Sequence, residues 1–388
     1  MQSFLIILAL VALFMIFWAM IGYPISIKLI DNILKPKENL KLENSNLSVT
    51  VMIVAHNEEK VIEEKLENVI DLNYPESQIK YLVTSDNSTD QTNEIVERFI
   101  SAHPEKNIKL FKAKKRMGKT NAQNEAQKIV DTDILVMTDA NAMLEKNSVK
   151  EIVSSFSSED IVYVAGKLTY SNANTNSTSE SESTYWDSDL AIRDVESRLQ
   201  TITAGNGALY AVRNKDYKDF DPINSHDSVM PTYYALNNKR AIFNKDAVAV
   251  EKAGETDSDE FGRKVRMNRI ILSFILPSIR ILNIFKYRWY TYFYLGHRSS
   301  RYLLWLNHIL LLLTSAVLSI NNGVFRLLFG AQILFFLIAL LQHYLRWNNK
   351  FVELIHYYAM TLLAQLVGIY KILTGNSKPF WEKAESTR

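Results

Sequence analysis

The sequence predicts an α/β domain with a parallel sheet, flanked by transmembrane α-helices at both ends of the chain. Uncharged apolar runs gather at the two ends, whereas the middle alternates runs of strand length with runs of helix length. The 388 residues are 47% hydrophobic, which is enough apolar mass to build a buried core. The 44 Lys and Arg nearly balance the 42 Asp and Glu, so the net charge of +2 does not indicate a nucleic-acid partner.

Composition also excludes several kinds of site. The chain has no Cys, which rules out disulfide frameworks, thiolate zinc sites, iron–sulfur clusters and thiol catalysis. Its 7 His show no paired metal-ligand spacing along the sequence. The lack of Cys does not by itself identify a cellular compartment.

The first segment has the length and composition of a membrane anchor. Residues 1–27 contain no charged side chain, and a helix over them could reach about 40 Å, more than the roughly 30 Å hydrocarbon core of a bilayer. A cleavable signal peptide is the alternative, but a cationic start and a clear small-residue cleavage site are missing. We therefore predict an anchor over residues 1–30. Because Lys28, Lys35, Lys37 and Lys41 follow it, the positive-inside rule places the middle domain in the cytoplasm of a multi-pass inner (plasma) membrane protein.

The middle of the chain repeats a strand followed by a helix. Residues 47–54, LSVTVMIV, form a continuous apolar and β-branched run, and residues 58–72 place apolar side chains at helical spacing. The unit recurs with strands over 81–84, 108–111 and 134–137 and helices over 91–100, 119–130 and 148–156. This repetition predicts a parallel sheet with helices on both faces and ligands beyond the carboxyl ends of its strands. Residues 171–184, SNANTNSTSESEST, have the composition of a loop.

Polar residues follow three of these strands and should converge on one crevice. They are Ala55, His56, Asn57 and Glu58 after the first strand, the run 85–90 after the second, and the run 138–141 after the fourth. Asp90 directly precedes a helix and is expected to cap it, whereas Asp86 at the strand end has no such role.

A basic loop before the third helix imitates a phosphate-binding loop. Residues 113–120, AKKRMGKT, follow a strand and open a helix, which by itself would indicate an ATPase. A phosphate cradle needs backbone amides freed by small residues, and this loop is filled by long side chains. We expect a basic loop that contacts an anionic ligand, with a solvated charged turn as the alternative.

The C-terminal part predicts interfacial helices and then membrane spans. Residues 268–285 are apolar but interrupted by Arg269, Pro277 and Arg280, which favours helices over 267–300 lying in the interface; a core helix of the middle domain is the alternative. Uncharged runs over 302–325, 327–345 and 354–370 are each about long enough to cross, within a region of 301–374. Three more spans would put the basic tail, 375–388, outside, against the positive-inside rule. The last run is therefore either re-entrant or interfacial, or the weak third run is not a full span.

Taken together, the motifs AHNEE, SDNSTDQT, KKRMGKTNAQNEA and MTDANA resemble those of the membrane-bound glycosyltransferases of family 2. The later blocks YWDSDLAIRDVES, GNGALYAVR, HDSVMP and DEFGRKVRMNR look like those of its cellulose, hyaluronan and poly-N-acetylglucosamine synthases. The resemblance covers about residues 47–301. It implies a GT-A nucleotide-diphospho-sugar transferase domain over 47–266 that inverts configuration in one displacement.

The same resemblance implies a donor site for a nucleotide-sugar, expected to be a UDP-sugar. Five positions match the base- and ribose-contacting residues of the family, namely Ala55, His56, Asn57, Glu58 and Asp86. Lys119 matches its nucleotide-contacting lysine. Asp139 falls on the first acid of the family's Asp-x-Asp, which implies Mg2+ or Mn2+ as cofactor. The second acid is replaced by Asn141, whose amide oxygen can ligate a metal but adds no charge.

The catalytic base implied by the resemblance is Asp227. The residue before it is usually an acid, and here it is His226, whose effect on the base depends on its own protonation. Arg263 and Arg266 lie where processive relatives carry Gln-x-x-Arg-Trp, so the guanidinium for the leaving diphosphate is kept and the acceptor-stacking Trp is lost. Trp186 and Glu196 are expected to shape the acceptor side.

We therefore expect an enzyme of cell-surface polysaccharide synthesis that transfers a hexose from a nucleotide-sugar to a glycan or lipid-linked acceptor at the bilayer. A second hypothesis is the transfer of one sugar to polyprenyl phosphate or a glycolipid, which would give a single product rather than a ladder of oligomers. A third hypothesis is a non-catalytic membrane subunit of a synthase complex, based on the departures at Asn141, His226 and Arg263.

Overall fold

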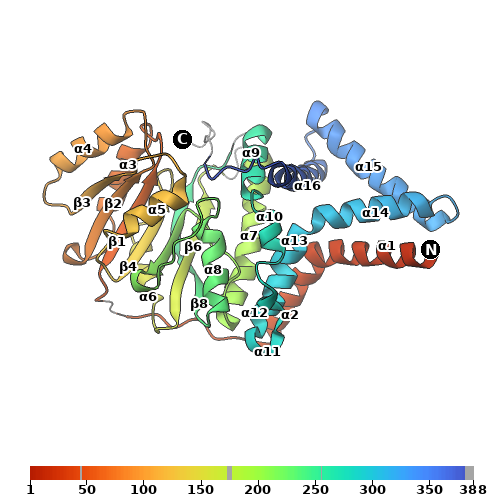
Figure 1. The fold of residues 1–388 in the computed structure, drawn as a ribbon, viewed down its shortest axis with the longest axis horizontal. Coiled ribbons are helices and arrows are strands. Elements are labelled where there is room, and N and C mark those ends of the chain that lie inside the picture. The colour runs from red at the N-terminus through yellow and green to blue at the C-terminus, as the bar shows by residue number, and fades with distance from the viewer. Residues whose placement is uncertain (44–45, 173–176, 255, 381–388) are drawn as a thin grey trace.

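The computed structural model describes residues 1–43, 46–172, 177–254 and 256–380. Within them, the middle of the chain forms an eight-stranded sheet in the order β3-β2-β1-β4-β7-β6-β8-β5 (Figure 1). Its strands are β1 (Val49–Ala55), β2 (Ile79–Ser85), β3 (Ile108–Lys112), β4 (Ile134–Asp139), β5 (Met143–Leu144), β6 (Ile161–Tyr170), β7 (Leu209–Arg213) and β8 (Arg240–Glu251). The predicted α/β fold with helices at both ends is present.

The first four long strands are parallel, as the strand and helix alternation predicted. Strand β1 pairs in parallel with β2 and with β4, and β2 pairs in parallel with β3. The prediction of a parallel sheet is wrong at two strands of the other half, because β7 is antiparallel to both β4 and β6 and β5 is antiparallel to β8, whereas β6 and β8 are parallel. The alternation ends at about residue 156, and the single long helix between β6 and β7 returns the chain in the opposite direction.

Helices cover both faces of the sheet because successive side chains of a strand point to opposite faces. Val51 and Ile53 of β1 pack with α3 (Ile62–Ile70), α4 (Thr92–Ala102) and α6 (Ser148–Ser154). Met52, between them, packs on the other face, where the helices are α5 (Lys119–Gln127) and α8 (His226–Leu236). Both clusters consist of fully or almost fully buried side chains.

The predicted loop over 171–184 is wrong in its second half. Residues 173–176 lie outside the described residues, and helix α7 (Ser177–Leu199) begins directly after them. The apolar part of α7, from Trp186 onward, is buried against the sheet. Extending an existing helix costs far less free energy than nucleating a new one. The packed part of α7 can therefore extend into the polar sequence before it, although that sequence has the composition of a loop.

The helices at the two ends have the length and apolar character of membrane spans. One helical stretch, Gln2–Leu34, comprises α1 (Gln2–Phe17), a π-helical turn (Trp18–Gly22) and α2 (Tyr23–Leu34). In the described residues, Gln2–Leu34, α15 (Gly323–Leu345) and α16 (Lys350–Leu373) are long and apolar enough to cross a membrane. The segment Trp289–Tyr302, bent by 59° onto α14 (Leu304–Leu318), would be a fourth span if the pair is taken together. Figure 1 shows α1, α14 and α15 extending away from the sheet.

Helix α16 differs from α1, α14 and α15 because it lies along the sheet domain. It packs on α9 (Asp257–Met267), where the Tyr357 hydroxyl donates a hydrogen bond to Glu260 over 3.1 Å. Three turns later, Gly368 lies so close to Asn268 that an added Cβ would be 2.7 Å from the Asn268 Cβ. Beyond α16 the chain reaches the sheet domain, where the Phe380 ring lies 5.0 Å from the Arg116 guanidinium.

Short helices join the sheet domain to α14. They are α10 (Ile271–Ile275), a 3-10 turn (Ile279–Leu282), α11 (Ile284–Tyr287), α12 (Trp289–Phe293), a π-helical turn (Tyr294–Ser299) and α13 (Ser300–Tyr302). Several of their apolar side chains face outward, with Ile279 76% and Phe285 93% exposed. This combination of short helices and exposed apolar side chains is the pattern expected of segments in a membrane interface.

A buried polar network fastens the N-terminal helix to the sheet domain. The Tyr23 hydroxyl donates to the Glu196 carboxylate over 2.7 Å, and His297 lies 2.8 Å from the same carboxylate. On its other side His297 lies 3.0 Å from Asp189, which also pairs with Arg193 over 2.7 Å. The network therefore joins α2, α7 and the π-helical turn Tyr294–Ser299.

Candidate active site

A cavity of about 470 Å³ opens at the carboxyl ends of β1, β2 and β4. Ten of the residues singled out in the sequence line it: Ala55, His56, Asp86, Lys119, Asp139, Asn141, Trp186, Asp227, Arg263 and Arg266. The two carboxylates on which the expected chemistry depends, Asp139 and Asp227, thus face the same cavity. Asn57 and Glu58 are not among the described residues that line it.

Asn57 and Glu58 instead hold together the turns that follow β1 and β2. The Asn57 side chain accepts a hydrogen bond from the Thr89 backbone N–H over 2.8 Å. Glu58 is fully buried, and its backbone N–H donates to the Thr92 hydroxyl over 2.8 Å. Asn57 has a φ of +53°, a left-handed conformation that Asn tolerates better than most residues. These two residues therefore stabilise the turn beside His56 and do not line the cavity.

Asp86 organises the basic loop. It is almost fully buried, and its carboxylate accepts hydrogen bonds from the backbone N–H groups of Met117 and Gly118 over 3.1 and 2.9 Å. The Asp86 carbonyl lies 2.8 Å from His56 Nδ1, which ties the first strand end to the second. Because the carboxylate already uses these two amides, the loop cannot present them to a phosphate as a phosphate-binding loop would.

Asp139 is held by Lys119 at the end of β4. The Lys119 Nζ lies 2.5 Å from Asp139 Oδ1 and donates to the Gly207 carbonyl over 3.2 Å. A Cβ on Gly207 would lie 3.1 Å from that Nζ and 3.4 Å from Asp139 Oδ2, so the glycine keeps space open beside the carboxylate. One carboxylate and the nearby Asn141 amide offer hard oxygen ligands, which fit Mg2+ or Mn2+.

A buried lysine lies beneath Asp139 and was not singled out in the sequence. Lys65 of α3 is fully buried, and its Nζ donates to the Thr138 hydroxyl over 3.0 Å and to the Ala142 carbonyl. Burial lowers the pKa of Lys65 to about 7, although Asp139 and Glu251 act to raise it. The sequence does carry a signal, because Lys65 interrupts the apolar face that the helix shows to the sheet.

Asp227 lies in the first turn of α8, where the helix dipole favours a carboxylate. Its carbonyl accepts a hydrogen bond from the Gly205 N–H over 2.7 Å. The preceding His226 is buried, with Nδ1 2.8 Å from Gln123 Oε1. Burial, and then the Lys119 charge, lower the pKa of His226 to about 3, so the imidazole is neutral near neutral pH. His226 therefore adds no positive charge beside Asp227, which answers the question that the sequence left open.

Three arginines from α9 and the residues after it line the cavity opposite the strands. Arg263 forms a bidentate ion pair with Glu260, in which its Nε and Nη2 donate to the two carboxylate oxygens over 2.7 and 2.8 Å. Burial, and then the neighbouring Arg263 and Arg269, lower the pKa of Arg266 to about 10, which leaves it charged near neutral pH. Arg269, which the resemblance did not assign, donates to the Asn224 carbonyl over 3.1 Å and to the Ser225 hydroxyl over 2.7 Å. It thereby holds the turn that leads into Asp227.

The other end of the cavity reaches the interfacial helices. Trp186 of α7 lines it and lies under the Arg193 guanidinium, 5.3 Å from the ring centroid. Phe274 and Tyr302 also line the cavity, and both come from the segment that joins the sheet domain to α14. Glu196, expected to shape the acceptor side, lies instead in the buried network with Tyr23 and His297.

Residues 50–239 match the family described as Glycosyl transferase family 2. Over 136 residues the chain is 26% identical to a β-monoglucosyldiacylglycerol synthase of Nostoc sp., a match that covers 35% of this chain and 29% of the relative. Over 225 residues it is 23% identical to a hyaluronan synthase of Streptococcus pyogenes, covering 54% of each. The matches thus span about a third to a half of the length of the curated relatives.

Among solved structures, the chain is similar to the mannosyltransferase PcManGT of Pyrobaculum calidifontis, which was solved in complex with GDP-Man and Mn2+. The TM-score is 0.69 at 21% identity, and the similarity covers 94% of this chain and 99% of the other. The predicted GT-A fold is confirmed by this likeness together with the family match.

Proposed function

Because residues 50–239 form a domain of glycosyl transferase family 2, we propose that the protein is an inverting transferase that moves a sugar from a nucleotide-sugar to an acceptor at a membrane. The observation that carries this proposal is the single cavity that contains Asp139 and Asp227 and continues to Phe274 and Tyr302. It offers a place for a charged donor at one end and for a membrane-borne acceptor at the other.

In the proposed donor complex, the nucleotide lies over the ends of β1 and β2. His56 and Asp86 face its base and ribose, while Asn57 and Glu58 hold the turn beside them. Lys119 and Arg266 bring positive charge to the diphosphate. Asp139 and Asn141 would hold Mg2+ or Mn2+, which supplies further charge to neutralise the leaving group. Lys119 then shifts its ammonium from Asp139 toward the phosphates.

In the proposed reaction, the acceptor hydroxyl oxygen attacks the anomeric carbon of the donor sugar. The bond from that carbon to the diphosphate oxygen breaks as the new glycosidic bond forms, and the hydroxyl proton passes to the Asp227 carboxylate. A single displacement of this kind inverts the anomeric configuration. Arg266 stabilises the charge that develops on the departing diphosphate, and Arg269 keeps Asp227 in place through the preceding turn.

The acceptor that the cavity favours is a lipid-linked one. Phe274 and Tyr302 line the cavity, and the interfacial segment to which they belong also exposes Ile279 and Phe285. A polar head group entering from the interface would reach Asp227 while its lipid part stayed in the bilayer. The β-monoglucosyldiacylglycerol synthase relative supports this acceptor class. Elongation of a polysaccharide is the second candidate, supported by the similarity to hyaluronan synthase.

The contacts of α16 support a specific membrane arrangement. In this proposal residues 1–30 anchor the chain, 47–266 carry the transferase, 267–300 lie in the interface and 301–374 include the C-terminal spans. Helix α1, the bent pair that ends in α14, and α15 cross the plasma membrane, whereas α16 lies along α9 on the cytoplasmic side. Lys371 and Lys378 then share that side with Lys28 and Lys35, as the positive-inside rule requires. Residues 381–388 of the predicted tail lie outside the described residues.

The proposal is tested with the full chain in lipid nanodiscs that contain candidate lipid acceptors. A panel of nucleotide-sugars, UDP-sugars first, is supplied with Mg2+ or Mn2+, and the release of nucleoside diphosphate is measured. We expect one productive donor, a dependence on the divalent ion, and a product in which a single sugar is joined to lipid. A ladder of oligomers would favour polysaccharide synthesis. No release with any donor would support the non-catalytic subunit and overturn the proposal.

A further inference from the structure

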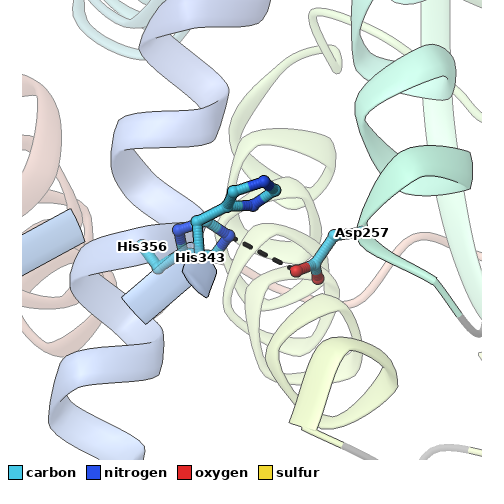
Figure 2. A group of neighbouring side chains, drawn as sticks. All are labelled: Asp257, His343 and His356. Atoms are coloured by element: carbon cyan, nitrogen blue, oxygen red, sulfur yellow. Dashed lines mark ion pairs between the residues drawn. The ribbon is translucent and has the colours of Figure 1, made fainter. Parts of the chain in front are cut away.

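Three side chains that do not line the cavity come together where α9 meets α15 and α16. His343 lies in the last turn of α15, His356 in the second turn of α16, and Asp257 begins α9. Each offers one ligand atom, and these atoms all lie within 4.8 Å of one another (Figure 2). We propose that this cluster binds a divalent transition-metal ion, with Zn2+ as the best match to its ligands.

The spacing is close to that of a zinc site. His356 Nε2 lies 3.4 Å from Asp257 Oδ2, while the edges of a tetrahedral site with bonds of about 2.0–2.1 Å measure about 3.3–3.4 Å. The two imidazole rings lie nearly parallel, with their centroids 5.8 Å apart. His343 is exposed, so a change of its side-chain rotamer can bring its nitrogen to the same distance. In this proposal, the distances of up to 4.8 Å shorten by adjustment of the side chains.

The orientation of His356 is already that of a metal ligand. Its Nδ1 lies 3.0 Å from the Ala339 carbonyl, an acceptor that requires the proton to be on Nδ1. Nε2 is the atom that faces Asp257 and pairs with it over 3.4 Å when the ring is protonated, and loss of that proton on metal binding would free the Nε2 lone pair for the ion. Metal-binding histidines usually donate their other ring N–H to a carbonyl or carboxylate in this way, which fixes both the ring and the tautomer.

The ligand set distinguishes this cluster from the cation site proposed at Asp139. Two imidazole nitrogens and one carboxylate suit Zn2+ and related transition metals, whereas Mg2+ prefers oxygen ligands alone. Three protein ligands would leave a fourth position for water. The pair was not visible in the sequence because its two histidines lie on separate helices and meet only when α15 turns back into α16.

A metal ion bound here would link α9 to the helices α15 and α16. Helix α9 starts at Asp257 and carries Glu260, Arg263 and Arg266, all of which line the cavity. Glu260 already accepts a hydrogen bond from Tyr357, the residue after His356. The ion would add a second contact one turn earlier and so fix the start of the helix that presents the arginines. The inference concerns metal binding and does not depend on the proposed transferase activity.

The test uses the full chain without a polyhistidine tag, reconstituted in nanodiscs and stripped with a chelator. ZnCl2 is then titrated in the presence of excess MgCl2, with a fluorescent chelator as competitor, and the metal that remains after dialysis is measured by mass spectrometry. We expect one Zn2+ per chain. His343→Ala, His356→Ala and Asp257→Asn should each weaken binding by at least about tenfold.

Two controls separate this site from other zinc-binding groups. His103→Ala removes a histidine that stacks on Phe99 in the sheet domain, and Asp139→Asn removes the proposed donor cation site; both should keep the zinc. A thermal unfolding scan without metal checks that each variant is folded. In a second scan, Zn2+ should raise the unfolding midpoint of the original chain but not that of the three cluster variants. Failure to retain stoichiometric zinc, or equal retention in the three cluster variants, would overturn the proposal.

Discussion

The two ends of the cavity are built in different ways. At the donor end, Asp86 and His56 stand at the ends of neighbouring parallel strands, and short backbone hydrogen bonds set their positions. The helix that carries Trp186 is instead fastened by contacts between segments far apart in the chain, such as Tyr23 with Glu196 and Glu196 with His297. The donor end depends on the order of strands in one sheet, whereas the membrane end depends on how separate helices pack.

The two ends meet at the backbone beside Asp227. Arg193, which pairs with Asp189 in the buried network, donates to the Gly205 carbonyl over 2.8 Å, and the Gly205 N–H donates to the Asp227 carbonyl. Arg298, next to His297, donates to the Thr203 carbonyl over 2.8 Å. The loop under the proposed base is thus supported by the same network that fastens the N-terminal helix, and substitutions can separate the two contributions.

The largest expected effect, on the turnover rate, is at Asp227, the proposed base that lies between the two ends of the cavity. Asp227→Asn keeps the shape of the side chain but removes its ability to accept a proton. We expect the turnover rate to fall by about 100- to 10,000-fold with little change in the thermal unfolding midpoint. Asp219→Asn, at an exposed carboxylate a short distance before it in the chain, is the matched control and should leave the rate unchanged. A Asp227→Asn variant that kept most of its activity would remove Asp227 from the mechanism.

Breaking the buried network should act on stability first. Glu196→Ala removes a fully buried carboxylate and leaves Tyr23 and His297 without their shared partner. Removing one member of a buried pair costs about 3–5 kcal/mol, so the thermal midpoint in nanodiscs should drop clearly. Lys80→Ala breaks an exposed pair with Asp131 and should cost at most about 1 kcal/mol. Equal effects of the two substitutions would show that the buried network does not stabilise the packing of the N-terminal helix on the sheet domain.

A smaller effect, dependent on pH, is expected at Lys65 under the donor end. Its folded pKa of about 7 lies below the ordinary lysine value of 10.5, so between these two pH values the unfolded chain binds more protons than the folded one. Stability should therefore rise with pH in this window, by up to about 1.4 kcal/mol per pH unit. Lys65→Met removes the titrating group, so the difference in unfolding free energy between it and the original chain should follow pH. Lys60→Met, the same substitution at an exposed position of the chain, is measured alongside for comparison.

The sequence predicted the strand ends of the sheet better than it predicted the packing between separate helices. The four parallel strands and the residues at their ends could be located because apolar runs mark the strands and parallel strands end at one edge. Lys65 and Arg269 were missed because their roles depend on which loop they lie against. The buried network and the His343 and His356 pair were missed because they join helices whose packing is not encoded in local periodicity. Asn57 and Glu58, predicted to contact the donor, bond to Thr89 and Thr92 of the neighbouring turn, which the sequence pattern did not indicate.

The smallest effect tests the place where the chain's last described residue touches the donor end. Phe380 lies 5.0 Å from the Arg116 guanidinium, and both line the cavity. Phe380→Leu keeps an apolar side chain but removes the cation–π contact, which contributes about 0.5–1 kcal/mol at a partly exposed site. The donor KM should therefore rise by about two- to fivefold while kcat stays the same. Phe351→Leu, at a position of α16 that is 71% exposed, serves as the control. A loss of kcat would instead mean that the segment after α16 takes part in the chemical step, and the division between the two ends would have to be redrawn to include it.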